Sequence, residues 1–268
     1  MTHAKLTLLA GSFLVIIGAG VALAQKPAEP VVKDGLHVVG VSVIQADPTS
    51  KIGGSLVMGQ QPGTRVYFML TNKDQFFVSV DDNAGKIESF QDDQGTDLRK
   101  GQMGSGFGPF PKLSEDGKSC MFEVACEKVP ASGAASLSIT GHAVVTVGLD
   151  AKTAEQADVE LKKDTKLSIG GLQAVVDSAE IHKFSDTPSL EITLKNDKGF
   201  DAIKSIYIVG TDGKAIKGEY RGYSNIGATF SRSYSFKTNS AKGKLGVVYF
   251  EKLQKQEVPI DVKVTLGL

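Results

Sequence analysis

The feature that most constrains this chain is a period-2 alternation of side chains that recurs along most of its length after Pro30. In one clear example, Val66, Phe68 and Leu70 point to one side of a segment and their neighbours point to the other. Successive side chains of a β-strand point to opposite faces, so this period indicates strands with one apolar face. The sequence therefore predicts an all-β fold. The polar stretch 151–163 is the exception, where we expect a short helix or a linker.

The alternating pattern occurs twice. Leu190, Ile192 and Leu194 repeat the face formed by the first example at an offset of 124 residues, from 66 to 190. The closing segments 136–148 and 258–268 also correspond. Each copy holds about seven strand-like runs, the number in a β-sandwich, and a lone sheet could not hide its apolar face. We therefore expect two tandem sandwich domains, residues 25–150 and 151–268.

The first 24 residues are typical of a secretory signal peptide. Lys5 supplies a positive charge, residues 6–23 are uncharged and apolar, and Ala22 and Ala24 present small side chains to a signal peptidase. We expect cleavage before Gln25 and an exported protein that is periplasmic, on the outer surface or secreted. An uncleaved membrane anchor is the alternative, because the apolar run is marginally long enough to span a bilayer.

With the segments around Val66 and Leu190, the closing segments and the signal peptide, the chain resembles exported bacterial proteins built from tandem immunoglobulin-like domains. This resemblance implies two immunoglobulin-like β-sandwiches and a range of roles that includes adhesins, chaperone clients and accessory proteins of surface pili. The chain departs from the antibody pattern in two ways. It contains no Trp, and no cysteine lies near Phe68 to form the bridge between sheets.

Composition and motifs also limit the classes of function that we expect. Lys plus Arg and Asp plus Glu both number 30, so no net field attracts nucleic acid or an anionic membrane. The sequence holds no HExxH, Gly-x-Ser-x-Gly or phosphate-loop motif. We predict a non-enzymatic protein with no cofactor, no nucleic-acid partner and no stable membrane insertion after signal cleavage. A hydrolase that pairs His37, His142 or His182 with a carboxylate is the remaining enzymatic hypothesis.

The two cysteines, Cys120 and Cys126, fall on the same face of one predicted strand. Six residues of strand span about 20 Å, whereas a disulfide requires Cα atoms within about 7 Å. Either the strand is broken between them, or both are buried free thiols that pack as small apolar groups.

Acidic residues gather in or beside predicted turns of the first copy. They are Asp81, Asp82, Asn83, Asp92, Asp93 and Asp97. Oxygen ligands that converge from a flexible loop are what calcium requires, so these residues are candidate metal ligands. The alternative is turn formation, since Asp and Asn side chains bond to their own backbone.

Two loops rich in glycine and aromatic residues occupy matching places in the copies, at 104–111 and 219–225. The candidate contact residues are Phe107, Phe110, Tyr220, Arg221 and Tyr223. Tyr and Arg are favoured in binding hot spots, so we predict contact with a protein partner or self-association, as in a surface appendage or adhesion component. In the alternatives, the aromatic side chains cover their own core, or the protein is a module that binds a glycan or calcium.

Overall fold

The computed structural model describes residues 35–45, 62–99, 105–108, 111–183, 188–210 and 213–267. These ranges contain fifteen strands and no helix, so the all-β prediction is confirmed. The predicted signal peptide, residues 1–24, lies outside them. Within the described ranges, no helix has the length and apolar character needed to cross a membrane.

The strands form three five-stranded sheets in which paired strands are antiparallel. In the first sheet the order is β1 (Leu36–Ile44), β2 (Gly63–Thr71), β6 (Ser119–Cys126) and β4 (Ser105–Phe107), and β5 (Lys112–Leu113) also pairs with β6. In the second sheet it is β13 (Glu219–Ile226), β14 (Thr229–Phe236), β10 (Ser189–Asn196), β9 (Leu172–His182) and β8 (Lys166–Ile169). In the third sheet it is β12 (Ala215–Lys217), β11 (Ile203–Val209), β15 (Lys242–Thr265), β7 (Ser136–Glu160) and β3 (Phe76–Asp92).

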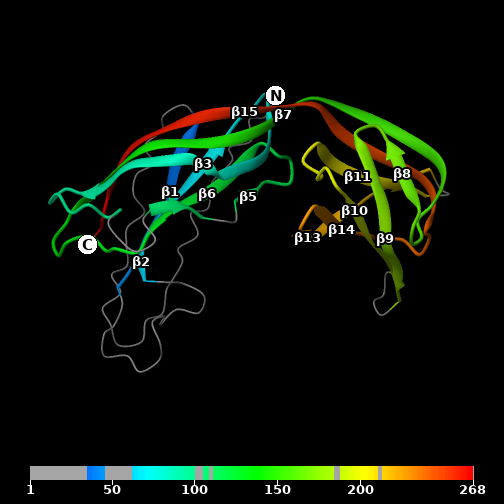
Figure 1. The fold of residues 1–268 in the computed structure, drawn as a ribbon, viewed down its shortest axis with the longest axis horizontal. Helices are drawn as coiled ribbons and strands as arrows, with labels where there is room; N and C mark the ends of the chain where they lie inside the picture. The colour runs from blue at the N-terminus through cyan, green and yellow to red at the C-terminus, as the bar shows by residue number, and fades with distance from the viewer. Residues whose placement is uncertain are drawn as a thin grey trace, which may run out of the picture.

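Two very long strands of the third sheet, β7 and β15, connect the two parts of the molecule (Figure 1). Within β7, only residues 137–148 pair with β3, and within β15, only residues 244–249 pair with β11. We define the first lobe as the first sheet with β3, residues 136–148 of β7 and residues 252–266. The second lobe is the second sheet with β11, β12, residues 150–160 of β7 and residues 242–250 of β15.

Each lobe therefore contributes the end of one long strand to the other lobe. Ile260, Val262 and Val264 near the end of β15 are buried in the core of the first lobe, and Val159 near the end of β7 is buried in the core of the second. The predicted domain boundary at residue 150 consequently falls inside β7. The two predicted closing segments pair with each other, because residues 258–265 of β15 pair with residues 136–143 of β7. They therefore do not close two separate sandwiches. The stretch 151–163, expected to be a helix or linker, is largely strand β7.

Each lobe repeats the same order of strands. β1-β2-β6-β4 in the first sheet corresponds to β9-β10-β14-β13 in the second. The strands β2 and β10 carry the sequence repeat, and both lie inside their sheets with a neighbour on each side. Their alternating apolar residues are accordingly buried on one face, which is what a period-2 pattern requires of a strand packed against a second sheet.

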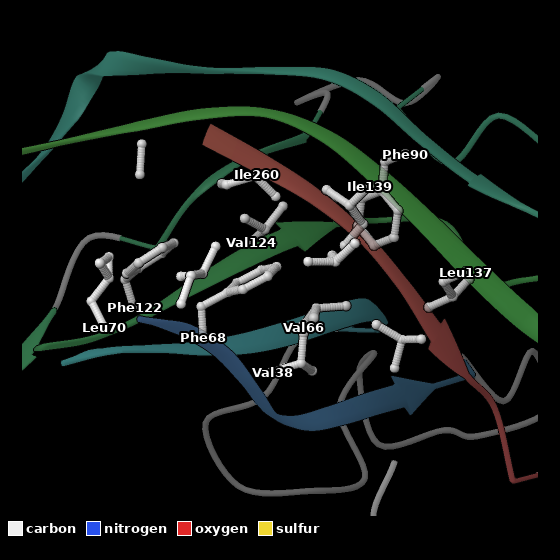
Figure 2. Packing of buried hydrophobic residues seen from close by; sticks show 14 of the residues in the cluster. Val38, Val66, Phe68, Leu70, Phe90, Phe122, Val124, Leu137, Ile139 and Ile260 are labelled. Atoms are coloured by element: carbon white, nitrogen blue, oxygen red, sulfur yellow. The ribbon is translucent and has the colours of Figure 1, made fainter. Parts of the chain in front are cut away.

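The core of the first lobe is rich in phenylalanine. Phe68 of β2 stacks on Phe122 of β6 with ring centroids 5.4 Å apart, and Figure 2 shows Ile260 from β15 entering the same core. Cys120 and Cys126 are free and buried on the core face of β6, so the free-thiol interpretation is the one that the structure shows. Burial raises the pKa of Cys120 to about 12, so its thiol stays protonated and inert at neutral pH.

Candidate protein interface

The acidic residues of the first lobe are engaged in turns. One carboxylate oxygen of Asp81 accepts backbone N–H groups of Asn83 and Ala84 at 3.2 and 3.1 Å, and the other pairs with Lys255 Nζ at 2.8 Å. The side chain of Asp82 lies outside the described residues. In the described part of the chain, no group of three or more His, Cys, Asp or Glu side chains is placed to hold a metal ion.

Asp92 is the most buried of these acids and organises the connection that follows β3. Its carboxylate accepts the backbone N–H groups of Gln94, Thr96 and Ala131 at 3.0, 2.8 and 2.8 Å. Burial by itself raises the pKa of Asp92, but these donors outweigh that effect and the pKa lies below its ordinary value. Asp92 is therefore a charged structural brace between two loops.

The remaining acids serve neighbouring turns in the same way. Asp93 accepts the backbone N–H of Ala135 at 3.0 Å, and Asp97 accepts the backbone N–H of Arg99 at 3.0 Å. Asp81, Asp92, Asp93 and Asp97 thus accept backbone N–H groups of nearby turns and loops, as the alternative interpretation of turn formation expects.

The first aromatic candidate, Phe107, faces its own core. It lies on β4, its ring centroid is 5.8 Å from that of Phe122, and it packs against the core of the first lobe. Gly85 makes room for it, since a Cβ at that position would lie 2.5 Å from the Phe107 ring. Phe107 therefore covers the core of the first lobe, as the alternative interpretation expects. Phe110 lies outside the described residues.

The second set of candidates occupies an exposed edge strand. Tyr220, Tyr223 and Ile226 of β13 are 60%, 52% and 79% exposed, and they make up three of the seven large hydrophobic side chains that are exposed in the described ranges. β13 ends its sheet, and its outer side meets no other strand of the described chain. The segment predicted to be a loop is thus an edge strand that exposes the two tyrosines on one face and Ile226 on the other.

The tyrosines are held from behind by β14. The guanidinium of Arg232 lies 5.8 Å from the Tyr220 ring centroid and 5.3 Å from that of Phe200, and its Nη1 donates to the Phe200 carbonyl at 3.2 Å. Tyr223 packs on Phe230 with ring centroids 6.5 Å apart. Within the described structure, Nε of Arg232 is buried without an acceptor. This arrangement restricts the aromatic side chains before any partner binds, which reduces the entropy lost on binding.

Arg221 lies on the opposite face of β13 from the two tyrosines. Its Nη2 is 3.2 Å from Glu219 Oε2, and the side chain borders a shallow cleft of about 160 Å³ on the outer face of the second sheet. The predicted contact residues on β13 are therefore divided between two faces. Ile226 was missed by the sequence analysis; its only signal was an isolated apolar residue in a polar segment before Gly227.

The same cleft contains the histidine–carboxylate contact that a hydrolase would need. His182 Nε2 lies 3.3 Å from Glu191 Oε2. The nearby hydroxyl oxygens of Thr193 and Ser233, however, are 2.9 Å apart and bond to each other. A serine or threonine nucleophile is activated by a direct hydrogen bond to its base, whereas the hydrogen bond made by Thr193 and Ser233 joins the two hydroxyls to each other.

No family model and no curated protein matches the chain. Among solved structures it is similar to a chain titled "Complete structure of manganese lipoxygenase of Gaeumannomyces graminis and partial structure of zonadhesin of Komagataella pastoris". The identity is 6% and the TM-score 0.14, over 84% of this chain and 95% of that chain. A similarity at this level carries no argument about fold or function.

Proposed function

We propose that the chain is a non-enzymatic exported protein, built from two immunoglobulin-like sandwich lobes, that acts through protein–protein contacts made by β13. The observation that carries this proposal is the exposure of Tyr220, Tyr223 and Ile226 on one free edge strand. The most concrete form of the role is a component of a surface appendage or adhesion complex. The signal-peptide pattern of residues 1–24 supports export to the compartment where such complexes assemble.

The chemistry of an edge strand suits a protein partner. Its outward N–H and C=O groups can pair with an extended segment, while side chains on alternate positions select the sequence that binds. Proteins usually protect such edges with charge, proline or cover. β13 has such charges in Glu219 and Arg221, but it also exposes two tyrosines and an isoleucine. Tyrosine combines a large contact area with few rotatable bonds.

The proposal is tested by capture from an envelope extract of the cells that make the protein. The variant Tyr220→Ser/Tyr223→Ser/Ile226→Ser removes the three exposed apolar side chains of β13, and we expect it to lose the partner that the unchanged chain retains. Ile181→Ser/Leu253→Ser is the matched control, because Ile181 and Leu253 are also exposed apolar residues but lie outside β13. An identical set of bound proteins for the unchanged chain and the β13 variant would refute the proposal.

Glycan binding is a second candidate at the same residues. The exposed rings of Tyr220 and Tyr223 offer the flat faces on which sugars stack, whereas a protein partner would also use the strand backbone. Calorimetry against a glycan panel separates the two. Heat that disappears in a Tyr220→Ser/Tyr223→Ser variant favours the glycan, and its absence with retained protein capture favours the protein partner.

A further inference from the structure

The carboxyl-terminal end of β15 belongs to the first lobe, although it lies far along the sequence from the other strands of that lobe. Ile260, Val262 and Val264 are 1%, 5% and 2% exposed, and Leu266 is 4% exposed. They pack in one core with residues of β2 and β6. One of these, Val66 of β2, precedes them in the sequence by nearly two hundred residues. The first lobe is therefore incomplete until this segment arrives.

This segment is held along one side only. Residues 252–265 of β15 pair with β7, and no other strand of the described chain pairs with them. The stretch that leads to it, residues 251–257, is exposed except for the half-buried Gln256. The cross-links at this stretch are surface contacts, such as Lys152 Nζ with Glu251 Oε1 at 2.6 Å and Lys255 Nζ with Asp81 Oδ2 at 2.8 Å. Exposed ion pairs of this kind contribute little to stability.

The crossing between lobes is also where the sheet is narrowest. β3 ends its pairing with β7 at Gly148 and β11 ends its pairing with β15 at Tyr249, so in the described structure no third strand pairs with residues 149–151 of β7 or 251–252 of β15. Asp150 adopts a left-handed conformation there, with φ of 53°. Two paired strands with few neighbours hold each other weakly, so this is the place at which β15 can separate from β7 at the lowest cost.

We infer that the carboxyl-terminal strand, residues 258–266, can be supplied to the first lobe by a second copy of the chain, giving a dimer with exchanged strands. The groove between β7 and the first sheet fits this occupant because it is the segment that fills it in the structure. Exchange keeps the buried contacts of residues 258–266 and gives up the pairing of residues 252–257 with β7 in the exposed connection. Strand exchange of this kind is a low-cost route to dimers. The zero net charge of the chain removes long-range repulsion between copies. This inference rests on the fold and is independent of β13.

The test uses single-cysteine variants on strands that face each other. Ser138 of β7 and Lys263 of β15 are direct partners in the ladder and point away from the core. Ser138→Cys and Lys263→Cys chains of different mass are mixed, unfolded, refolded together and treated with a short bis-maleimide reagent. The two native cysteines are buried and do not compete for the reagent. Exchange predicts a covalent heterodimer, whose yield rises with protein concentration during refolding.

The matched control is Thr193→Cys mixed with Ser233→Cys. These residues are also direct partners on neighbouring strands, but β10 and β14 both belong to the second lobe and to one continuous stretch of chain. We expect at least tenfold more heterodimer from the first mixture than from the control. A Ser138→Cys/Lys263→Cys double variant, cross-linked within one chain, verifies the geometry. Equal yields from the two mixtures, with that double variant cross-linking normally, would overturn the inference.

Discussion

The two lobes share one order of strands but use the strand that each receives from the other in different ways. In the first lobe, the received strand presents Ile260, Val262 and Val264 to the core. In the second, residues 150–158 of β7 are mostly exposed, and Val159 is the fully buried apolar residue of the received strand. The first lobe thus depends on side-chain burial by its borrowed strand, whereas the second receives mainly backbone pairing.

At the matching place in the second lobe, the side chains make polar contacts across the sheet. Tyr207 of β11 reaches over β15 and donates from its Oη to Glu155 of β7 at 2.8 Å, and Lys244 Nζ reaches the same carboxylate at 3.0 Å. Gly246 allows this reach, because a Cβ there would lie 2.0 Å from the Tyr207 ring. One topology can therefore be completed by an apolar strand or by a polar strand, provided that the strand forms its backbone hydrogen bonds to the neighbouring strand.

The edge strands of the two lobes differ in the exposure of their aromatic side chains. β4 and β13 occupy matching ends of the first and second sheets. Phe107 of β4 turns inward and packs on Phe122, whereas Tyr220 and Tyr223 of β13 remain exposed. Both strands end their sheets, but the aromatic side chain of β4 is turned inward and those of β13 are exposed, which is why we place the proposed contact surface in the second lobe.

The largest effect is expected from a charge in the borrowed strand of the first lobe. Val262→Asp buries an unpaired carboxylate and should lower the free energy of unfolding by about 3 kcal/mol or more. Ala154→Asp, at a half-buried position of the other borrowed strand, should cost about 1 kcal/mol. Urea unfolding, with hydrogen exchange read separately in each lobe, measures both. Equal losses in the two variants would contradict the asymmetry, and Lys263→Asp controls for added charge on an exposed neighbour.

A smaller, pH-dependent effect is expected at Asp92. Asp92→Asn weakens three hydrogen bonds made by backbone N–H groups to a charged acceptor and should cost about 2 kcal/mol at neutral pH. Because the pKa of Asp92 is lowered by folding, its stabilisation is complete above the ordinary Asp value of about 3.9. It is lost as the pH falls through that value toward the folded pKa.

The corresponding turn of the second lobe is closed by backbone bonds, in which Gly210 N–H donates to Lys214 and Gly213 N–H donates to Gly210. Acidification below pH 4 should therefore loosen the loops around Asp92 before it loosens that turn. Hydrogen exchange across a pH series measures this order, and Asp201→Asn at an exposed position is the control. An Asp92→Asn variant with an unchanged acid transition would show that the brace does not control it.

The smallest effects separate the two edge strands. Phe107→Ala removes a ring that covers a core and should cost about 1–2 kcal/mol. Tyr223→Ala removes an exposed ring and should change stability by less than about 0.5 kcal/mol. Thermal or urea unfolding distinguishes them. A larger loss for Tyr223→Ala would mean that β13 serves the stability of its lobe and not a partner.

Much of the local structure could be predicted from the alternation alone. The strands around Val66, Cys120 and Leu190 are buried on the predicted faces, and the unbroken strand β6 makes a bond between its two cysteines geometrically unreachable. The acidic turns were also identified by position, although the sequence left open whether they held a metal. Short-range rules suffice for these features because strand faces and turns depend on residues a few positions apart.

The amino-acid pattern alone indicates which face of a strand is apolar and which residues can end a strand. Only the tertiary structure decided that β7 and β15 cross from lobe to lobe, and that Tyr220 and Tyr223 stay in solvent while Phe107 does not. The physical reason is that an alternating strand specifies that one face must be buried without specifying against which partner. Several strands of similar pattern compete for each place in a sheet, and the choice depends on contacts between residues far apart in the chain.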